Sequence, residues 1–363
     1  MSTGEPLLLA IDLGTGSCRA ALFDTAGRQV AIGQREYLHH PEPGVPGSQC
    51  FDTTAAWALV VSCIREALGT ARCHGIDSDD GRRAPVAGRI AAVATTSMRE
   101  GMVLYDRSGV ELWACPNVDS RASEQAVELI GSGAAQRIFE LAGDWVAITS
   151  PARFRWIAEH RPDVLAATAH VGMIGDWAAT KLCGSFSTDP SLGSSSGMFD
   201  LARREWSAEI IALCGLDPAI FPEVSESGTV VGEVLPAVAE ETGLRAGTPV
   251  VVGGADTQMA LTGIGVCEPG RLSIVGGTFW QTTLLSDTPM IDSEVRLRTL
   301  CHSTPQRWMV EGIGFYCGMA MRWFRDAFCE LEVAEAAATG SDPYLLLEAK
   351  AAGLPPASGG LIG

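Results

Sequence analysis

The sequence predicts an α/β protein with two domains. Its 363 residues exceed what one hydrophobic core usually supports. Short apolar segments of strand length alternate with longer segments of helical periodicity. Two stretches also repeat one pattern, in which an apolar strand, a turn of glycine and threonine, and a second apolar strand follow one another. Each domain is therefore expected to contain one such hairpin, in Leu8–Phe23 and in Leu272–Leu285.

The boundary between the domains is predicted in a connector rich in glycine and proline. This connector, Gly243–Pro249, separates the short helical pattern Val234–Thr242 from the apolar strand Val250–Val252. We expect a first domain over residues 1–246 and a second over residues 247–363, and we expect the strand after the connector to open the second domain.

The first domain is expected to begin with a β-meander and a crossing helix. Three strands joined by turns precede a helix and a buried strand, at Leu7–Ile11, Cys18–Phe23, Val30–Arg35, Thr54–Leu68 and Ile90–Thr96. Helical patterns then predominate, and a turn-rich segment without predicted secondary structure follows them. The helices are Ser123–Ile130, Pro151–His160 and Met173–Leu182, and the turn-rich segment is Thr188–Gly197.

Composition excludes several classes of partner. The formal charge of −17 at pH 7 repels phosphate backbones, so no nucleic-acid partner is expected. No apolar stretch approaches the about 20 residues that cross a bilayer, and the N-terminus lacks signal-peptide features. We therefore expect a cytoplasmic protein without a membrane partner. The 11 cysteines form no C-x-x-C pair and are interpreted as reduced core thiols without a zinc site.

The first hairpin offers a cradle for phosphate groups. Asp12, at the end of the preceding strand, can hold hydrated Mg²⁺ against phosphates. An ordinary turn with favoured Asp and Gly residues is the alternative. The second hairpin has the same kind of turn at Gly276–Thr278, which favours a phosphate chain held from two sides. In the first hairpin, backbone N–H groups and two hydroxyls can point at an anion from Gly14, Thr15, Gly16 and Ser17.

Asp256 is the candidate general base. It follows the strand Val250–Val252, and a carboxylate at such a strand end can orient and deprotonate a hydroxyl that attacks a γ-phosphoryl group. Its neighbour Thr257 is a candidate substrate contact. The alternative is that Asp256 only caps the following helix, Met259–Ile264.

Two further polar clusters are candidates for substrate binding. The pair Arg99 and Glu100 follows the strand Ile90–Thr96 and can bind the donor and acceptor groups of a polyol. Asp119 lies in the second cluster, Trp113–Arg121. Each cluster also has a simpler interpretation, because most neighbouring Arg–Glu pairs are solvated and the second cluster can be a capped loop before a helix.

In this order, the motifs resemble the FGGY carbohydrate kinases, and the match runs along essentially the whole chain. The resemblance implies two ribonuclease-H-like domains around a nucleotide cleft, as in the actin-like ATPase superfamily, with ATP and Mg²⁺ as cofactors and a small molecule as substrate. The most similar stretches are Ile11–Ser17, Gly184–Pro190, Pro222–Gly232, Thr242–Asp256 and Gly276–Thr278.

The resemblance also implies roles for individual residues. Asp256 corresponds to the catalytic base and Asp12 to the carboxylate beside the metal. The pair Arg99–Glu100 matches the polyol contacts of related glycerol kinases, and Asp119 and Thr257 are expected to contact substrate as well. In the second domain, the implied nucleotide contacts are Gly277, Thr278 and Gly312.

The implied reaction is phosphorylation of a small polyol or ketose-like molecule by ATP. Five stretches are most similar to kinases that act on the terminal hydroxyl of linear dihydroxypentanedione, a form of the signal molecule autoinducer-2. These stretches are Val45–Ser48, Ser97–Gly101, Trp113–Asp119, Gly277–Gln281 and Met321–Cys329. A xylulose kinase or another ketose kinase is the alternative, because it would share the same machinery.

The second domain is expected to be truncated. Family members carry a second domain comparable with the first, including a late glycine-rich motif that packs against adenine, and residues 247–363 stop short of it. A catalytically impaired fragment that acts as a sugar-binding or regulatory protein is therefore an alternative of another class. The presence of Asp12, Asp256 and Thr278 favours the kinase.

Overall fold

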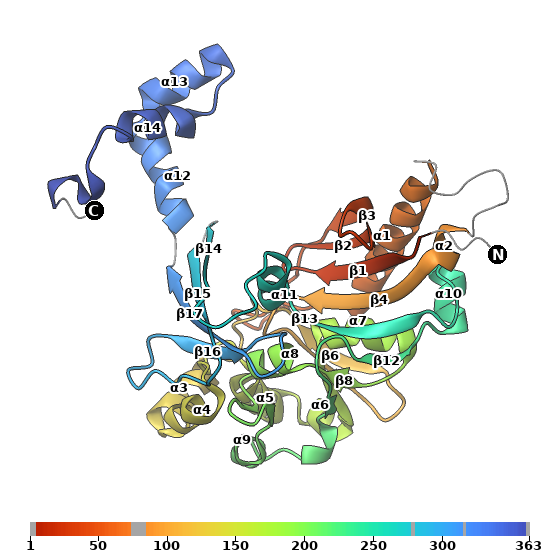
Figure 1. Cartoon of the computed structure of the whole chain (residues 1–363). Coiled ribbons are helices and arrows are strands. Elements are labelled where there is room, and N and C mark those ends of the chain that lie inside the picture. Colours follow the sequence, from red (N-terminus) through yellow and green to blue (C-terminus); the bar gives the residue numbers. More distant parts are fainter. Residues whose placement is uncertain (1–4, 74–84, 277–279, 315–316, 361–363) are drawn as a thin grey trace. The chain divides into compact units, whose positions relative to one another are not determined.

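The computed structural model describes residues 5–73, 85–276, 280–314 and 317–360 (Figure 1). The chain divides into two compact units. The first comprises Met1–Arg271 with Leu284–Glu311, and the second comprises Leu272–Thr283 with Gly312–Gly363. The domain boundary at residue 247 stays a proposal.

A six-stranded sheet organises the first unit. In chain order its strands are β1 (Leu7–Leu13), β2 (Ser17–Asp24), β3 (Gln29–Glu36), β4 (Ile90–Ser97), β12 (Val230–Glu233) and β13 (Pro249–Ala255). The first three strands form the antiparallel meander that the sequence predicts. β4 pairs parallel with both β1 and β13, and β12 pairs antiparallel with β13. The spatial order is β12-β13-β4-β1-β2-β3.

The alternation of side chains along β1 decides which face of the sheet is buried. Every second residue is apolar and fully buried, as expected for a strand with a period of two, at Leu7, Leu9, Ile11 and Leu13. Asp12 therefore points to the opposite face, away from this core.

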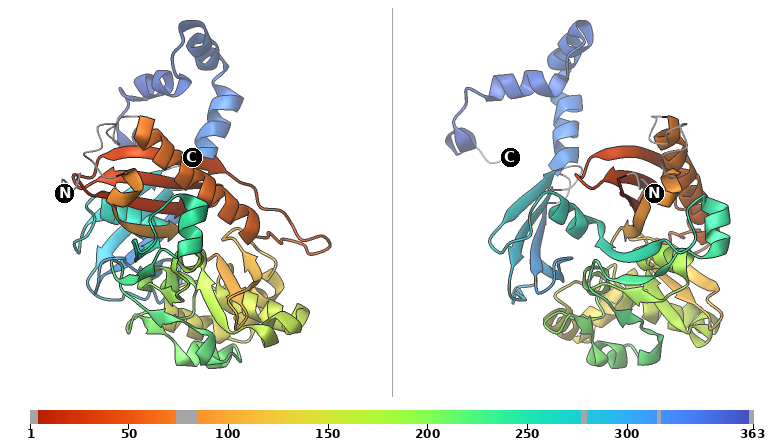
Figure 2. Two further views of the ribbon diagram at one scale, coloured as in Figure 1. Left: turned by 90° about the vertical axis from the view of Figure 1, so that its right-hand side faces the viewer. Right: turned by 45° about the vertical axis from the view of Figure 1, so that its right-hand side comes forward.

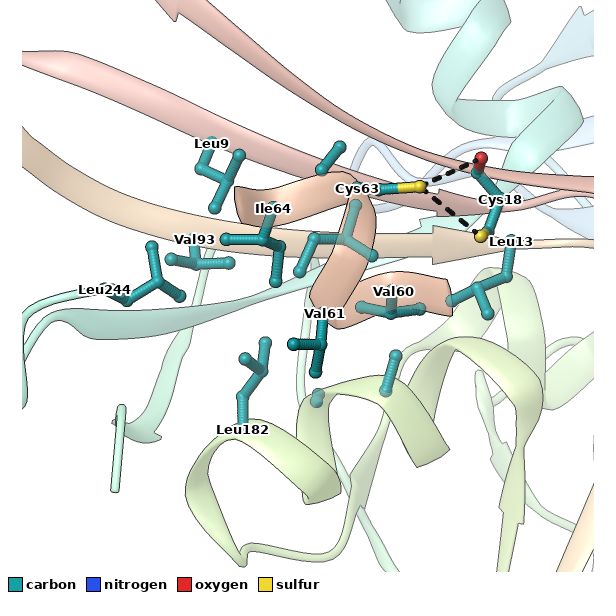
Figure 3. Close-up of a cluster of buried hydrophobic side chains, with 14 of the residues drawn as sticks. Leu9, Leu13, Cys18, Val60, Val61, Cys63, Ile64, Val93, Leu182 and Leu244 are labelled. Atoms are coloured by element: carbon teal, nitrogen blue, oxygen red, sulfur yellow. Dashed lines mark hydrogen bonds between the residues drawn. The ribbon is translucent and has the colours of Figure 1, made fainter. Parts of the chain in front are cut away.

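Two helices cover the buried face of the sheet, α1 (Thr53–Cys73) and α7 (Ile174–Cys183). α1 packs mainly on β2 and β3, whereas α7 packs on β4 and β13 (Figure 2). Figure 3 shows part of the shared core, with Val61 and Ile64 of α1, Leu9 of β1 and Leu182 of α7. Full burial of each such aliphatic side chain contributes about 1.5–3 kcal/mol. Two short helices belong to the same unit, α2 (Val86–Arg89) and α10 (Pro236–Thr242).

Residues between β4 and β12 form a largely helical part of the first unit with a core of its own. Its three-stranded sheet consists of β5 (Met102–Tyr105), β6 (Glu111–Cys115) and β7 (His170–Met173). The helices are α3 (Ser123–Gly131), α4 (Ala134–Ala142), α5 (Ser150–His160), α6 (Pro162–Ala167), α8 (Pro190–Ser195), α9 (Ala208–Leu213) and the 3-10 helix η1 (Pro218–Ile220). Two pairs of short strands complete it, β8 (Ser187–Thr188) with β11 (Glu223–Val224) and β9 (Phe199–Asp200) with β10 (Glu205–Trp206).

The rest of the first unit follows β13. Helix α11 (Asp256–Gly263) begins directly after that strand, and β16 (Arg298–Cys301) pairs antiparallel with the first half of β17 (Trp308–Gly314). The second unit contains the neighbouring strands β14 (Leu272–Gly276) and β15 (Trp280–Ser286), although β15 ends in the first unit. It also contains α12 (Cys317–Phe328), α13 (Glu330–Thr339), α14 (Pro343–Ala351) and η2 (Pro356–Gly359).

Two elements differ from the sequence-based expectation. The segment predicted to be turns contains α8, because the Asp189 carboxylate accepts hydrogen bonds from the N–H groups of Ser191 and Leu192, at 2.8 and 3.0 Å, and so caps the helix. The strand expected to open a second domain is part of β13, which pairs with β4 inside the first sheet. None of the helices in the described ranges is long and apolar enough to cross a membrane.

The close packing at Gly33 predicts opposite effects for two substitutions. A Cβ added at Gly33 of β3 would lie 2.2 Å from the carbonyl oxygen of Cys63 in α1. Gly33→Ala should therefore lower the free energy of unfolding by about 1–3 kcal/mol, because α1 must shift. Gly69→Ala, within α1 and without any atom within 4 Å of the new Cβ, should raise it by about 0.5–1 kcal/mol. Urea unfolding followed by circular dichroism measures both, and equal stabilities would contradict this packing.

Candidate active site

Three parallel strands bring the predicted site residues to one edge of the six-stranded sheet. Asp12 near the end of β1 is in register with Thr96 of β4, which is in register with Gly254 of β13. The pair Arg99–Glu100 follows β4 and Asp256 follows β13. The carboxyl ends of adjacent parallel strands meet at the same edge of a sheet, where ligands commonly bind in α/β folds. The structure therefore collects these candidates in one place within the first unit.

Gly253 lets β13 approach β4 closely enough to form this edge. A Cβ at this position would lie 1.8 Å from the carbonyl oxygen of Thr95, a distance that no side chain tolerates. The register between the two strands shifts between Val251 and Gly254, as at a β-bulge. The bulge changes the direction of the strand just before Asp256, and glycine is required for it.

Helix α8 supports the end of β13 through hydrogen bonds. The hydroxyl of Ser191 accepts a hydrogen bond from the N–H of Ala255, at 2.8 Å, and donates to the Asp189 carboxylate, at 2.6 Å. On the other side, the hydroxyl of Thr96 donates to the carbonyl oxygen of Gly254, at 2.7 Å. The backbone that carries the next residues is thus held from two neighbouring elements.

Asp256 is the first residue of α11, but its carboxylate does not cap the helix in the usual way. Its Oδ1 accepts hydrogen bonds from the N–H and the hydroxyl of Thr257, at 2.6 and 3.3 Å, whereas a cap accepts from residues two or three positions further on. Burial raises the pKa of Asp256 to about 6, against the lowering effect of the Arg99 guanidinium, and Asp12 and Glu100 raise it further. A carboxylate with this pKa is well suited to general-base catalysis near neutral pH.

Asp12 has the features of a carboxylate beside a metal ion. Its Oδ1 is buried and has no hydrogen-bond partner, and its Oδ2 lies 3.5 Å from Nη1 of Arg19. Burial raises the pKa of Asp12, against the lowering effect of Arg19. In the described part of the chain, no three His, Cys, Asp or Glu side chains gather into a metal site. The unpartnered Oδ1 of Asp12 can accept a hydrogen bond from a water of a hydrated Mg²⁺.

The glycine-threonine hairpin between β1 and β2 is held from one side. The Tyr37 hydroxyl donates to the carbonyl oxygen of Gly14, and a ring nitrogen of His39 lies 2.8 Å from the carbonyl oxygen of Thr15. The side-chain amide of Asn117 donates to the Thr15 hydroxyl, at 3.0 Å. These contacts engage two carbonyl groups and the Thr15 hydroxyl, and they leave the N–H groups of Thr15 and Gly16 for another partner.

The other side of the hairpin is open. Within the described residues, the N–H groups of Thr15 and Gly16 have no hydrogen-bond acceptor, whereas the N–H of Gly14 donates to the carbonyl oxygen of Ser17 at 2.9 Å. Neither glycine has a positive φ, so a tight turn does not require them. A Cβ at Gly16 would meet no atom within 4 Å. The fold therefore does not require glycine at position 16, and the space beside it is open.

Arg99 and Glu100 belong to a buried ion cluster and are not solvated. The cluster contains five side chains, each at most 6% exposed: Arg99, Glu100, Asp144, Arg298 and Glu311. Arg99 binds Glu311 through two hydrogen bonds, at 3.0 and 3.3 Å. Arg298 donates from Nε to Glu311 at 2.8 Å and from Nη1 to Glu100 at 2.9 Å, and it lies 3.5 Å from Asp144. The interpretation of the pair as solvated is therefore wrong.

Two carboxyl groups of the buried ion cluster have pKa values that are shifted in opposite directions. Burial raises the pKa of Asp144 to about 6, although Arg298 lowers it. Burial also acts to raise the pKa of Glu311, but the charges of Arg298 and Arg99 outweigh it and keep that pKa below its usual value. Sequence reasoning missed Asp144, Arg298 and Glu311. The available signal was a charged residue at the start of the apolar strand β16 and another inside the apolar strand β17.

Asp119 lies in a second buried group of charges. It is 1% exposed, and its carboxylate accepts hydrogen bonds from the N–H of Gln49, at 2.7 Å, and from Nε of Arg121, at 2.8 Å. The buried Arg153 links this group to the ion cluster, because it donates to the carbonyl oxygens of both Asp119 and Glu100. A role for Asp119 in substrate binding stays a prediction.

The nucleotide contacts expected from the second domain stay predictions. Gly277 and Thr278 lie outside the described residues. Gly312 lies on β17 within the second unit.

A meander followed by parallel strands, with carboxylates at their carboxyl ends beside an open hairpin, defines an actin-like ATPase fold of the sugar-kinase type. The model of the FGGY family of carbohydrate kinases, N-terminal domain, matches residues 7–263. The chain belongs to the FGGY family of carbohydrate kinases. The predicted family and fold class are therefore confirmed.

Two curated relatives show how much of a family member this chain covers. Autoinducer-2 kinase from Yersinia enterocolitica serotype O:8 / biotype 1B is 42% identical, over 99% of this chain and 66% of the relative. Autoinducer-2 kinase from Yersinia pestis bv. Antiqua (strain Angola) is 43% identical, over 98% of this chain and 65% of the relative. The chain thus spans about two thirds of the length of these relatives.

Two solved structures of similar fold are also kinases by name. Xylulose kinase from Rhodospirillum rubrum has a TM-score of 0.84 and 26% identity, over 98% of this chain and 69% of that one. Glycerol kinase from Plasmodium falciparum with ADP has a TM-score of 0.76 and 18% identity, over 90% of this chain and 64% of that one. At that identity, the second likeness shows the fold alone.

The environment of Asp256 predicts a titration that depends on Arg99. The carboxyl group should titrate near pH 6 in the unmodified chain, and Arg99→Gln should move its pKa upward because the lowering charge is lost. Arg137→Gln, which removes a charge from an exposed ion pair with Glu209, is the control and should leave the Asp256 titration in place. Carbon NMR of the carboxyl groups, assigned with Asp256→Asn, measures the pKa. An unchanged pKa in Arg99→Gln would contradict the described site.

Proposed function

We propose that this chain carries the substrate-binding and phosphate-binding half of an ATP-dependent kinase for a small polyol or ketose-like sugar. The observation that supports this most is the position of Asp256, with a pKa raised to about 6, at the sheet edge that also carries Asp12 and the pair Arg99–Glu100. The open hairpin Gly14–Ser17 lies at the same end of β1 and offers free amides to an anion.

In the proposed reaction, Asp256 acts as the general base. Its ionised carboxylate accepts the proton of a substrate hydroxyl while that oxygen attacks the γ-phosphorus of ATP. The bond between the γ-phosphorus and the bridging oxygen of the β-phosphate breaks, the phosphate ester of the substrate forms, and ADP leaves with that oxygen. A pKa of about 6 keeps most Asp256 ionised at neutral pH while leaving it basic enough to accept the proton.

The other residues bind and orient the reactants. Arg99 and Glu100 hold substrate hydroxyls, and Asp119 and Thr257 are proposed as further substrate contacts. The N–H groups of the hairpin Gly14–Ser17 bind phosphate oxygens. Bound Mg²⁺ supplies positive charge that offsets the charge of the phosphates, and Asp12 would hold it through water. In the second domain the proposed nucleotide contacts are Gly277, Thr278 and Gly312.

The proposed substrate is the linear dihydroxypentanedione form of autoinducer-2, phosphorylated on its terminal hydroxyl. Identity of 42% to autoinducer-2 kinase from Yersinia enterocolitica over 99% of this chain supports it. The alternative substrate is xylulose or another ketose, supported by the structural likeness to xylulose kinase from Rhodospirillum rubrum. A protein that binds sugar without phosphoryl transfer is the alternative of another class.

One experiment separates these possibilities. The purified chain is titrated calorimetrically with dihydroxypentanedione and with D-xylulose, and ADP release is then measured for each sugar in the presence of ATP and Mg²⁺. Turnover with dihydroxypentanedione in preference to xylulose supports the proposed substrate, and the reverse preference supports the ketose kinase. Sugar binding without ADP release supports the sugar-binding protein, and absence of both overturns the proposal.

Removal of the base should affect turnover and not sugar affinity. Asp256→Asn keeps the shape of the side chain but cannot accept the proton, so kcat should fall by at least about 10²-fold. In the unmodified chain, kcat should also decrease as the pH falls through about 6, because Asp256 becomes protonated. ADP release measured as a function of pH tests both effects. Near-normal turnover in Asp256→Asn would show that another group accepts the proton.

The open side of the hairpin predicts a selective loss of nucleotide affinity. Gly16→Ala places a methyl group where nothing in the chain lies within 4 Å, so its stability should not change. Because the methyl group occupies the space proposed for a phosphate, ATP binding should weaken by about 1–3 kcal/mol. Calorimetric titration with ATP and thermal unfolding measure the two effects, with Gly69→Ala as the control for ATP affinity. Unchanged ATP affinity would mean that phosphate does not bind at this hairpin.

A further inference from the structure

Glu100 is held in an unusual backbone conformation by several contacts. Its φ of 61° lies in the left-handed region, which side chains other than glycine seldom adopt. The carbonyl oxygen of Glu100 accepts a hydrogen bond from the buried Arg153, and its N–H donates to the hydroxyl of Ser195 in α8, at 3.4 Å. Such strain persists only where the surroundings enforce it, and it is concentrated at functional sites.

Only one of the contacts to Glu100 fixes its carboxylate through a hydrogen bond. Nη1 of Arg298 donates to Oε1 of Glu100 at 2.9 Å, whereas Nε of Arg99 lies 3.8 Å from the same oxygen, beyond hydrogen-bond distance. Within the described residues, Oε2 of Glu100 accepts no hydrogen bond. The carboxylate therefore has one oxygen held by the protein and one oxygen available to a ligand.

Arg298 is itself held in this position by several contacts. Its Nε donates to Glu311 at 2.8 Å, its Nη1 lies 3.5 Å from Asp144, and its guanidinium lies 5.8 Å from the centre of the Trp145 ring. The side chain is 4% exposed. A planar guanidinium with several simultaneous partners holds each of them in a defined direction, which the single ammonium group of lysine cannot do.

We propose that Arg298 is a positioning residue for substrate recognition: it holds the Glu100 carboxylate so that Oε2 can accept a hydrogen bond from a substrate hydroxyl. This inference rests on the proposed function, because it assumes that Glu100 binds the sugar. Arg298 acts through Glu100 and does not touch the substrate. It reaches the site from β16, which is separated from Glu100 by 198 residues in the sequence.

The test is a double-mutant cycle on sugar affinity. Arg298→Gln, Glu100→Gln and the double variant are titrated calorimetrically with dihydroxypentanedione and with D-xylulose, and circular dichroism with urea unfolding verifies that each variant is folded. Each single substitution should weaken binding of the sugar that the unmodified chain prefers by about tenfold or more, the scale for a hydrogen bond to a charged group. The double variant should bind no more weakly than the weaker single variant, because both changes remove the same contact.

Two further variants make the result specific. Arg298→Lys keeps the charge but loses the planar fork that directs Nε at Glu311 and Nη1 at Glu100, so it should give a smaller loss that also disappears in the background of Glu100→Gln. It also replaces Arg298→Gln in the cycle if the latter does not fold. Arg137→Gln, which breaks an exposed ion pair with Glu209, is the matched control and should leave sugar affinity unchanged.

The outcomes distinguish this inference from the proposed function. If the unmodified chain binds either sugar but folded Arg298 variants bind equally well, or if their losses add to that of Glu100→Gln, Arg298 does not act through Glu100 and the inference is overturned. If the unmodified chain binds neither sugar, the proposed function fails and the inference fails with it. If Arg298→Gln weakens sugar binding in the unmodified chain but causes no further loss in the background of Glu100→Gln, the inference is supported.

Discussion

The parallel pairing of β1, β4 and β13 is the constraint on which the candidate site depends. The register places Asp12, Thr96 and Gly254 side by side, so the residues that follow these positions meet at one edge of the sheet. The pairing is possible only because Gly253 has no side chain, since a Cβ there would lie 1.8 Å from a backbone oxygen of the neighbouring strand. A change at this glycine would displace Asp256 without touching any group that takes part in the proposed chemistry.

Helix α8 connects the strand ends to one another. Three of its serines each form a hydrogen bond with a different segment of the site. Ser191 binds the backbone at the end of β13, Ser194 binds the N–H of Cys301 in β16 at 2.9 Å, and Ser195 binds the N–H of Glu100. Hydrogen bonds of this kind are worth about 0.5–1.5 kcal/mol each. Their main consequence here is geometric, because one short buried helix determines the relative positions of three site segments.

Burial of the ion cluster costs free energy. Removing charged groups from water is expensive, and well-packed apolar residues often replace buried ion pairs without loss of stability. In this cluster three carboxylates accompany the two arginines Arg99 and Arg298, so the positive charges do not balance the negative ones. The proposed role of Arg298 in orienting Glu100 gives a reason for such an arrangement that stability does not. Neighbouring carboxylates of the cluster also differ in proton affinity, because burial raises the pKa of Asp144 whereas the charges of Arg298 and Arg99 lower the pKa of Glu311.

Signals between near neighbours in the chain were enough to predict the local parts of this protein. Periodicity and turn residues predicted the meander, α1 and β4. Positions at or just after the strand ends made Asp12, Arg99, Glu100 and Asp256 candidate site residues. The sequence did not predict that β13 joins the first sheet or that Asp189 caps a buried helix where turns were expected. It also did not predict that Glu311 and Arg298 contact the Arg99–Glu100 pair. These contacts join residues 198 and 212 positions apart, and at such separations no periodic pattern records which side chains will meet.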